Sequence, residues 1–284
     1  MVDIGSGPPL LLIPGVQGRW EWMGPAVDSL KDRCRVISFS LAGDPGSGRR
    51  FDPTRGFDNY VDQIEEALTY AGTDDVAVCG VSFGGLVALH WATRRPERTK
   101  ALVLVSTPSP DFKPDCRIEW YLRAPRLLSP LFAAQSPFRL GPEIWRAFDG
   151  VADRARFTGR HLARIVRSPS SPTRMAERAR LLAAMDFGEA CGRVSAPTLV
   201  VTGEPGLDRV VPVAGTRSYA DRISGARHAT LTRTGHIGLV TKPERFADLV
   251  GQFVDETAGE ALASAQISGP TSDEMMRRPA EASV

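Results

Sequence analysis

The chain carries little net charge. Lys and Arg together number 35 and Asp and Glu 33 in 284 residues, which gives a formal charge of +2. A charge this small produces no strong field that would attract nucleic acid or an anionic membrane. We therefore expect neither of these as a partner, and the charge of any substrate stays open.

Long hydrophobic runs are also missing. No stretch reaches the roughly 20 apolar residues that span a bilayer. The chain starts with Met1, Val2 and Asp3 instead of a basic segment followed by an apolar one, the pattern of a secretory leader. These absences predict a cytoplasmic protein.

Cysteine is scarce, and the few cysteines lie far apart. Cys34, Cys79, Cys116 and Cys191 include no C-x-x-C pair, and the first two lie inside apolar, strand-like runs. A free thiol in such a run behaves as a small hydrophobe. The spacing therefore predicts buried free thiols instead of a metal or redox motif.

Short apolar runs alternate with stretches of helical length. The runs are rich in Val, Ile and Leu and lie at 10–13, 35–39, 76–79, 101–105 and 198–202. Continuous apolar runs of this length are typical of strands buried on both faces. Residues 57–71 place apolar groups on one face at spacings of three and four, as a helix does. The alternation predicts the α/β class, with a mostly parallel central sheet flanked by helices.

Residues 112–191 break this rhythm. The segment is rich in Arg, Pro and aromatic residues and has no strand-like run, so it reads as a helical insertion. An insertion at the carboxyl ends of parallel strands would lie over the crevice where such sheets bind ligands. We predict a core domain from 1–111 and 192–256, a helical cap or lid from 112–191, and a disordered tail from 257–284, where apolar residues are few.

The strongest motif follows the run at 76–79. Gly80-Val81-Ser82-Phe83-Gly84 leads directly into a helical stretch, and strand, G-x-S-x-G and helix in this order form a nucleophile elbow. The turn leaves no room for side chains at Gly80 and Gly84, while its strained backbone raises the Ser82 hydroxyl above the sheet. The amino terminus of the helix then faces the negative charge that develops in acyl transfer.

With this elbow the chain resembles the α/β-hydrolase family from about Leu10 to Val254. In that family the turn after an early central strand supplies a backbone N–H to the oxyanion hole, and the matching segment here is 11–18. Pro14 stands where the family usually has His, which leaves the backbone donors in place. The resemblance implies that the N–H groups of Val16 and Phe83 hold the oxyanion.

A serine hydroxyl needs a base within hydrogen-bond reach, and the sequence offers four histidines. His236 lies in a glycine-flanked loop after the last apparent strand, which is where the resembled family places its base. His90 lies on the helix after Ser82 and points away from the elbow tip, and His228 opens a strand, so both are expected to be structural. His161 lies in the insertion, where it is expected to be structural or to line a pocket.

The acid of the triad lies between Ser82 and His236, since the order along an α/β-hydrolase is Ser, acid, His. The loop after the strand at 198–202 resembles the family's pattern of Gly, acid, small apolar residue and Pro, with Asp208 as the acid. Glu204 in the same loop stays open as a rival. Asp111, which follows the apolar run at 101–105, also stays open, because some members of the family take the acid from the end of that strand.

These parts predict a serine hydrolase that cleaves an ester, thioester or activated carbonyl through an acyl-enzyme, with no metal or organic cofactor. Relatives that open epoxides or remove halide carry Asp at the elbow, so Ser82 argues against that chemistry. Carbon–carbon bond hydrolysis, acyl transfer and a non-catalytic ligand-binding role stay open, as does the choice between monomer and homodimer. The partner is a small molecule, and the residues predicted to line its apolar pocket are Trp20, Trp22, Trp120, Tyr121 and Trp145.

Overall fold

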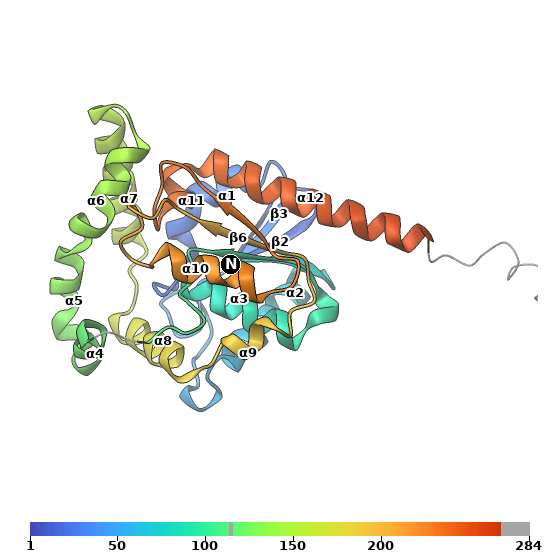
Figure 1. Cartoon of the computed structure of the whole chain (residues 1–284). Helices are drawn as coiled ribbons and strands as arrows, with labels where there is room; N and C mark the ends of the chain where they lie inside the picture. Colours follow the sequence, from blue (N-terminus) through green and yellow to red (C-terminus); the bar gives the residue numbers. More distant parts are fainter. Residues whose placement is uncertain (114–115, 268–284) are drawn as a thin grey trace, which may run out of the picture.

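The computed structural model describes residues 1–113 and 116–267. A seven-stranded sheet crosses the molecule in the order β1-β3-β2-β4-β5-β6-β7 (Figure 1). The strands are β1 (Val2–Ile4), β2 (Pro9–Ile13), β3 (Arg35–Ser38), β4 (Val76–Val81), β5 (Thr99–Val105), β6 (Thr198–Thr202) and β7 (Arg227–Thr230). Neighbouring strands are parallel except for β1 against β3. The predicted α/β class and mostly parallel sheet are confirmed.

Helices cover both faces of this sheet, which is why its central strands are apolar throughout. Alternate residues of a strand point to opposite faces. Leu11 and Val78 pack toward α2 (Asp58–Ala71) and α3 (Phe83–Arg94). Leu12 and Cys79 pack toward α1 (Gly24–Leu30) and α12 (Pro243–Ile267). Because no face is left to solvent, the strands read as continuous apolar runs.

The chain between β5 and β6 is helical. It contains α4 (Cys116–Arg123), α5 (Pro125–Ala134), α6 (Ser136–Ala147), α7 (Val151–Arg167), α8 (Pro172–Ala184) and α9 (Gly188–Cys191). Helices α4 to α6 form a column along one side of the sheet body, whereas α8 and α9 lie against the body itself (Figure 1). Leu182 of α8 accordingly belongs to the buried core. We call residues 112–191 the insertion.

The last helix is longer than the sequence suggested. The expected tail from residue 257 is wrong as far as residue 267, because α12 continues to Ile267 and extends beyond the sheet (Figure 1). Alanine is frequent from 258 to 265, and alanine has the highest helix propensity of all residues. The rest of the predicted tail, 268–284, lies outside the described residues. Within residues 1–113 and 116–267, no helix combines the length and the apolar character needed to cross a membrane.

Candidate active site

The strand order brings the three predicted catalytic side chains to one edge of the sheet. Ser82 follows β4, Asp208 lies in the loop after β6, and His236 lies in the loop after β7. These strands are parallel, so their carboxyl ends meet at the edge where open α/β sheets bind ligands. Ser82, Asp208 and His236 are 9%, 7% and 8% exposed. All three therefore lie just below the surface.

The backbone around Ser82 has the strain expected of a nucleophile elbow. Ser82 has φ 54° and ψ −122°, a conformation that side-chain-bearing residues rarely adopt. A β carbon on Gly80 would collide with the carbonyl oxygen of Gly84, and one on Gly84 would collide with that of Ile13. The Ser82 N–H donates to the Val105 carbonyl oxygen at 2.8 Å, which ties the turn to the neighbouring strand. Glycine at both positions is a steric requirement here.

Asp208 and His236 form a hydrogen-bonded pair. Nδ1 of His236 lies 3.3 Å from Oδ2 of Asp208, and Oδ1 of Asp208 accepts the N–H groups of Val210 and Val211 at 3.0 and 2.8 Å. Burial acts to raise the pKa of the Asp208 carboxyl, but the hydrogen bond and charge of His236 and the two N–H groups outweigh it. The pKa of this carboxyl is therefore lowered, and Nδ1–H donation to it leaves Nε2 as the acceptor.

The two rival acids have other partners. Oε1 of Glu204 accepts the backbone N–H of Arg233 at 2.7 Å. Asp111 forms an ion pair with Arg222, with Nη1 and Oδ1 3.1 Å apart, and its side chain is largely exposed. Among the three candidates, Asp208 is thus the acid that His236 contacts.

The remaining histidines lie in other surroundings. Nε2 of His90 is 3.1 Å from Oδ1 of Asp58, and burial lowers the pKa of His90. Nε2 of His228 is 2.9 Å from the hydroxyl oxygen of Thr202. His161 lies on α7 in the insertion, where burial also lowers its pKa. The contacts of His90 and His228 fit the structural roles expected of them.

The turn predicted to form the oxyanion hole lies against the elbow. The N–H of Gly18 donates to the Gly15 carbonyl oxygen at 2.9 Å, and a β carbon on Gly15 would lie 3.3 Å from Cβ of Ser82. Val16 follows the glycine that contacts Ser82, and Phe83 follows Ser82 itself. Phe83 is the first residue of α3, so its N–H has no acceptor within that helix. The structure thus brings both donor-bearing residues beside Ser82.

A buried ion pair supports this turn, and the sequence patterns did not reveal it. Arg178 of α8 pairs with Asp44 in the loop after β3, and both side chains are almost fully buried. Arg178 also donates to the Val16 carbonyl oxygen at 2.9 Å and to the Tyr60 hydroxyl at 3.3 Å. Burial raises the pKa of Asp44, and Arg178 opposes that rise. The available signal was the glycine-rich segment at 41–48, which follows β3 and contains Asp44.

Two of the predicted pocket residues lie where the insertion meets the core. Trp20 and Trp22 belong to the short helix η1 (Trp20–Met23), directly after the oxyanion turn, and both are half-buried. Nε1 of Trp22 donates to the Ser168 carbonyl oxygen at 2.9 Å, and its ring meets that of His161 edge-on at 6.4 Å. The insertion therefore contacts the core beside the candidate site.

Two other predicted pocket residues lie elsewhere. Trp120 is 58% and Trp145 66% exposed, and the guanidinium of Arg154 covers the Trp145 ring at 3.7 Å. Both side chains are thus largely exposed to solvent, and their place in a substrate pocket stays a prediction. Basic, amphipathic helices resemble pocket-lining ones in sequence, because both carry regularly spaced aromatic residues. The Tyr121 hydroxyl donates to the Pro172 carbonyl oxygen at 3.3 Å, which joins α4 to α8.

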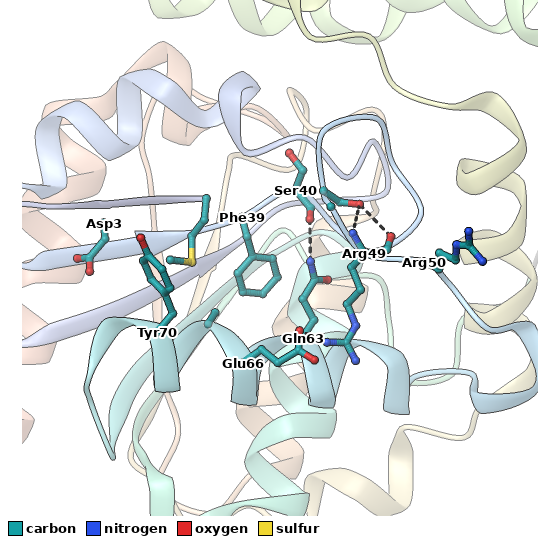
Figure 2. Close-up of a pocket in the computed structure, with 12 residues that line it drawn as sticks. Asp3, Phe39, Ser40, Arg49, Arg50, Gln63, Glu66 and Tyr70 are labelled. Carbon is teal, nitrogen blue, oxygen red and sulfur yellow. Dashed lines mark hydrogen bonds and ion pairs between the residues drawn. The ribbon is translucent and has the colours of Figure 1, made fainter.

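A hollow of about 1030 Å³ lies near the edge of the sheet formed by β1 and β3. Figure 2 shows its lining from β1, the end of β3, the loop at 47–50 and α2. Arg49 forms an ion pair with Glu66, and Gln63 donates to the Ser40 carbonyl oxygen at 2.9 Å. The residues that line this hollow do not include Ser82, Asp208 or His236, so it is distinct from the candidate catalytic site. In the described part of the chain, no cluster of His, Cys, Asp and Glu is arranged to hold a metal ion.

The fold and this site define a class of protein. The chain belongs to the alpha/beta hydrolase fold family, whose sequence profile matches residues 8–243. It is an enzyme of this family, a hydrolase similar to esterases.

Particular relatives are similar over nearly the whole chain. A poly(3-hydroxyalkanoate) depolymerase of Ectopseudomonas oleovorans is 27% identical, over 89% of this chain and 87% of the relative. A 2-hydroxymuconate semialdehyde hydrolase of a Pseudomonas species (strain CF600) is 29% identical, over 92% and 91%. The solved esterase of Exiguobacterium antarcticum matches with a TM-score of 0.72 at 19% identity, over 89% of this chain and 94% of that one. This last likeness shows the fold alone.

Proposed function

We propose that the protein is a serine hydrolase that cleaves an ester, or a related activated acyl bond, of a small and largely apolar substrate. The observation that carries the proposal is the Asp208–His236 hydrogen bond at the sheet edge where Ser82 sits on a strained elbow. A nucleophile, a base and a carboxylate that orients the base are the parts that covalent acyl transfer requires.

The reaction then has two halves. His236 takes the Ser82 proton on Nε2 while the serine oxygen attacks the carbonyl carbon, and the N–H groups of Val16 and Phe83 stabilise the oxyanion. Collapse of this intermediate expels the alcohol, which receives the proton from His236. A water molecule then attacks the acyl-enzyme with His236 as base, which releases the acid and restores Ser82. Asp208 stays ionised throughout and stabilises the imidazolium.

We further propose that the insertion acts as a cap over a core domain formed by 1–111 and 192–256. The contacts of Trp22 with Ser168 and His161 support this, because they join the insertion to the core directly after the oxyanion turn. An apolar acyl group would be held between these two parts. Trp20 and Trp22 are the aromatic residues best situated to contact it.

Carbon–carbon bond hydrolysis is a second candidate, favoured by the likeness to the 2-hydroxymuconate semialdehyde hydrolase. It would use the same three side chains on a different substrate. Product analysis separates the two reactions. An ester yields an alcohol and an acid, whereas a diketone acid cleaved at a carbon–carbon bond yields two acids, a new carboxylic acid and a keto acid that keeps the substrate's original carboxyl group.

Labelling with a fluorophosphonate probe, followed by peptide mass mapping, tests the proposal. The wild type is expected to carry one label on Ser82, and both Ser82→Ala and His236→Ala are expected to remain unlabelled. His90→Ala is the matched control, because it removes a partly buried histidine that contacts Asp58, and its labelling should stay at the wild-type rate. A folded wild type that takes no label would refute the hydrolase mechanism and favour a binding protein.

A further inference from the structure

A second carboxylate lies next to the loop that carries His236, and it comes from the insertion. Glu143 of α6 is 0% exposed. Its Oε2 accepts the backbone N–H of Ile237 at 3.0 Å, and its Oε1 accepts the hydroxyl of Thr241 at 3.3 Å. Ile237 directly follows His236, and Thr241 ends α11 (Gly238–Thr241). One side chain therefore holds the loop and the short helix that follow the base.

Burying this carboxylate is unfavourable by itself. Burial raises the pKa of Glu143, the N–H groups of Ile237 and Gly235 and the charge of His236 oppose that rise, and Asp208 adds to it. Burying a charged group carries a large desolvation penalty, so a buried charge is weak evidence that the side chain is there for stability. Stability of the insertion alone therefore does not explain why a carboxylate lies here. Its hydrogen bonds to Ile237 and Thr241, beside the base, offer an explanation.

The insertion meets the same loop at a second point. Nε of Arg233 donates to the Arg146 carbonyl oxygen at 3.0 Å, and the Arg233 guanidinium forms an ion pair with Asp149. Asp149 is largely exposed, and a surface pair of this kind contributes little. Arg233 lies three residues before His236, at the outer end of the contact. Glu143 provides the buried part of the contact, at the residue next to the base.

We propose that Glu143 is a positioning residue for His236: by accepting the Ile237 N–H, it fixes the backbone of the base loop, so that the insertion helps to set the orientation of the imidazole. This inference rests on the proposed role of His236 as base. A displacement of the base by about 1 Å is enough to lower a rate about 100-fold. The hydrogen bond therefore acts on the rate of proton transfer and leaves substrate binding unchanged.

Three variants of Glu143 test this assignment. Glu143→Leu removes the acceptor and fills the same space, Glu143→Ala removes it and leaves room for water, and Glu143→Gln keeps an amide oxygen for the Ile237 N–H. We expect the fluorophosphonate labelling rate and the kcat for a p-nitrophenyl ester to fall about 30- to 100-fold in Glu143→Leu, with KM within twofold of wild type. Glu143→Gln should stay within about threefold of wild type.

Asp149→Asn is the matched control, because it changes the same charge at the exposed part of the same contact and should label at the wild-type rate. Circular dichroism melting shows that each variant is folded at the assay temperature, and Glu143→Ala replaces Glu143→Leu if the latter is not. A folded Leu or Ala variant with wild-type kcat would overturn the assignment, and so would a Gln variant as slow as Leu. Absence of labelling in the wild type would count against the hydrolase proposal itself, which keeps the two failures distinct.

Discussion

Asp208→Asn separates the roles of the two carboxylate oxygens. Oδ1 accepts two backbone N–H groups, from Val210 and Val211, so the amide oxygen of Asn is expected to keep that position. The amide NH₂ then faces Nδ1 of His236 and donates to it. The imidazole must place its proton on Nε2, and a protonated Nε2 cannot take the proton from Ser82. In other Ser-His-Asp triads this change lowers kcat about 10⁴-fold, which corresponds to about 5.4 kcal/mol.

The assay compares kcat and the fluorophosphonate labelling rate of Asp208→Asn with those of Glu204→Gln and Asp111→Asn. The latter two carboxylates bind Arg233 N–H and Arg222, so their loss should change either rate by less than about threefold. A thermal melt within a few degrees of wild type would show that Asp208→Asn is folded. If Asp208→Asn retained more than a tenth of the wild-type rate, or if one of the two controls fell as far, the assignment of the acid would be refuted.

Three further changes test the support of the site. Gly84→Ala would force a β carbon into carbonyl oxygens at the end of β2. This variant should lower the free energy of unfolding, measured with urea, by about 3 kcal/mol. Gly206→Ala is the control and should have little effect, because a β carbon there meets nothing within 4 Å. Arg178→Met leaves Asp44 buried without its ion-pair partner and should lower the free energy of unfolding by about 3–5 kcal/mol. A double variant that also carries Asp44→Leu should recover part of this loss. One thiol, that of exposed Cys116, should react with Ellman's reagent at pH 8 in the native protein. Cys34, Cys79 and Cys191 are buried, and burial raises the pKa of each thiol, to about 11 in Cys34 and Cys191. These three thiols should react only after the protein is unfolded.

The sheet was predictable because burial on both faces leaves a local signal. Each of the five apolar runs became a strand, and the helix expected at 57–71 forms as α2 (Asp58–Ala71). The elbow was equally predictable from the sequence, because its steric demands require glycine at Gly80 and Gly84, two residues before and after Ser82. In both cases the constraint acts between residues that are close in the sequence.

The contacts made by the insertion left no such signal. Arg178 and Asp44 are 134 residues apart, and Glu143 and Ile237 are 94 apart. In the sequence Glu143 is one acid on an amphipathic helix, and Arg178 is one of many arginines in the insertion. Whether such a side chain is exposed or buried depends on how the helices dock, which periodicity does not encode. The same limit explains why the sequence did not show that Trp120 and Trp145 are largely exposed.

Two buried charged side chains of the insertion contact different halves of the proposed catalytic machinery. Arg178 holds the carbonyl of Val16 in the oxyanion turn, and Glu143 holds the N–H of Ile237 beside the base. Ser82 and Asp208, by contrast, are positioned by the strands and loops of the core. A segment that only covered a pocket would need apolar contacts alone, whereas these two charged residues fasten it to the loops on either side of the nucleophile. The insertion is therefore expected to govern turnover as well as substrate choice, because movement of α6 or α8 would alter the geometry at which the serine reacts.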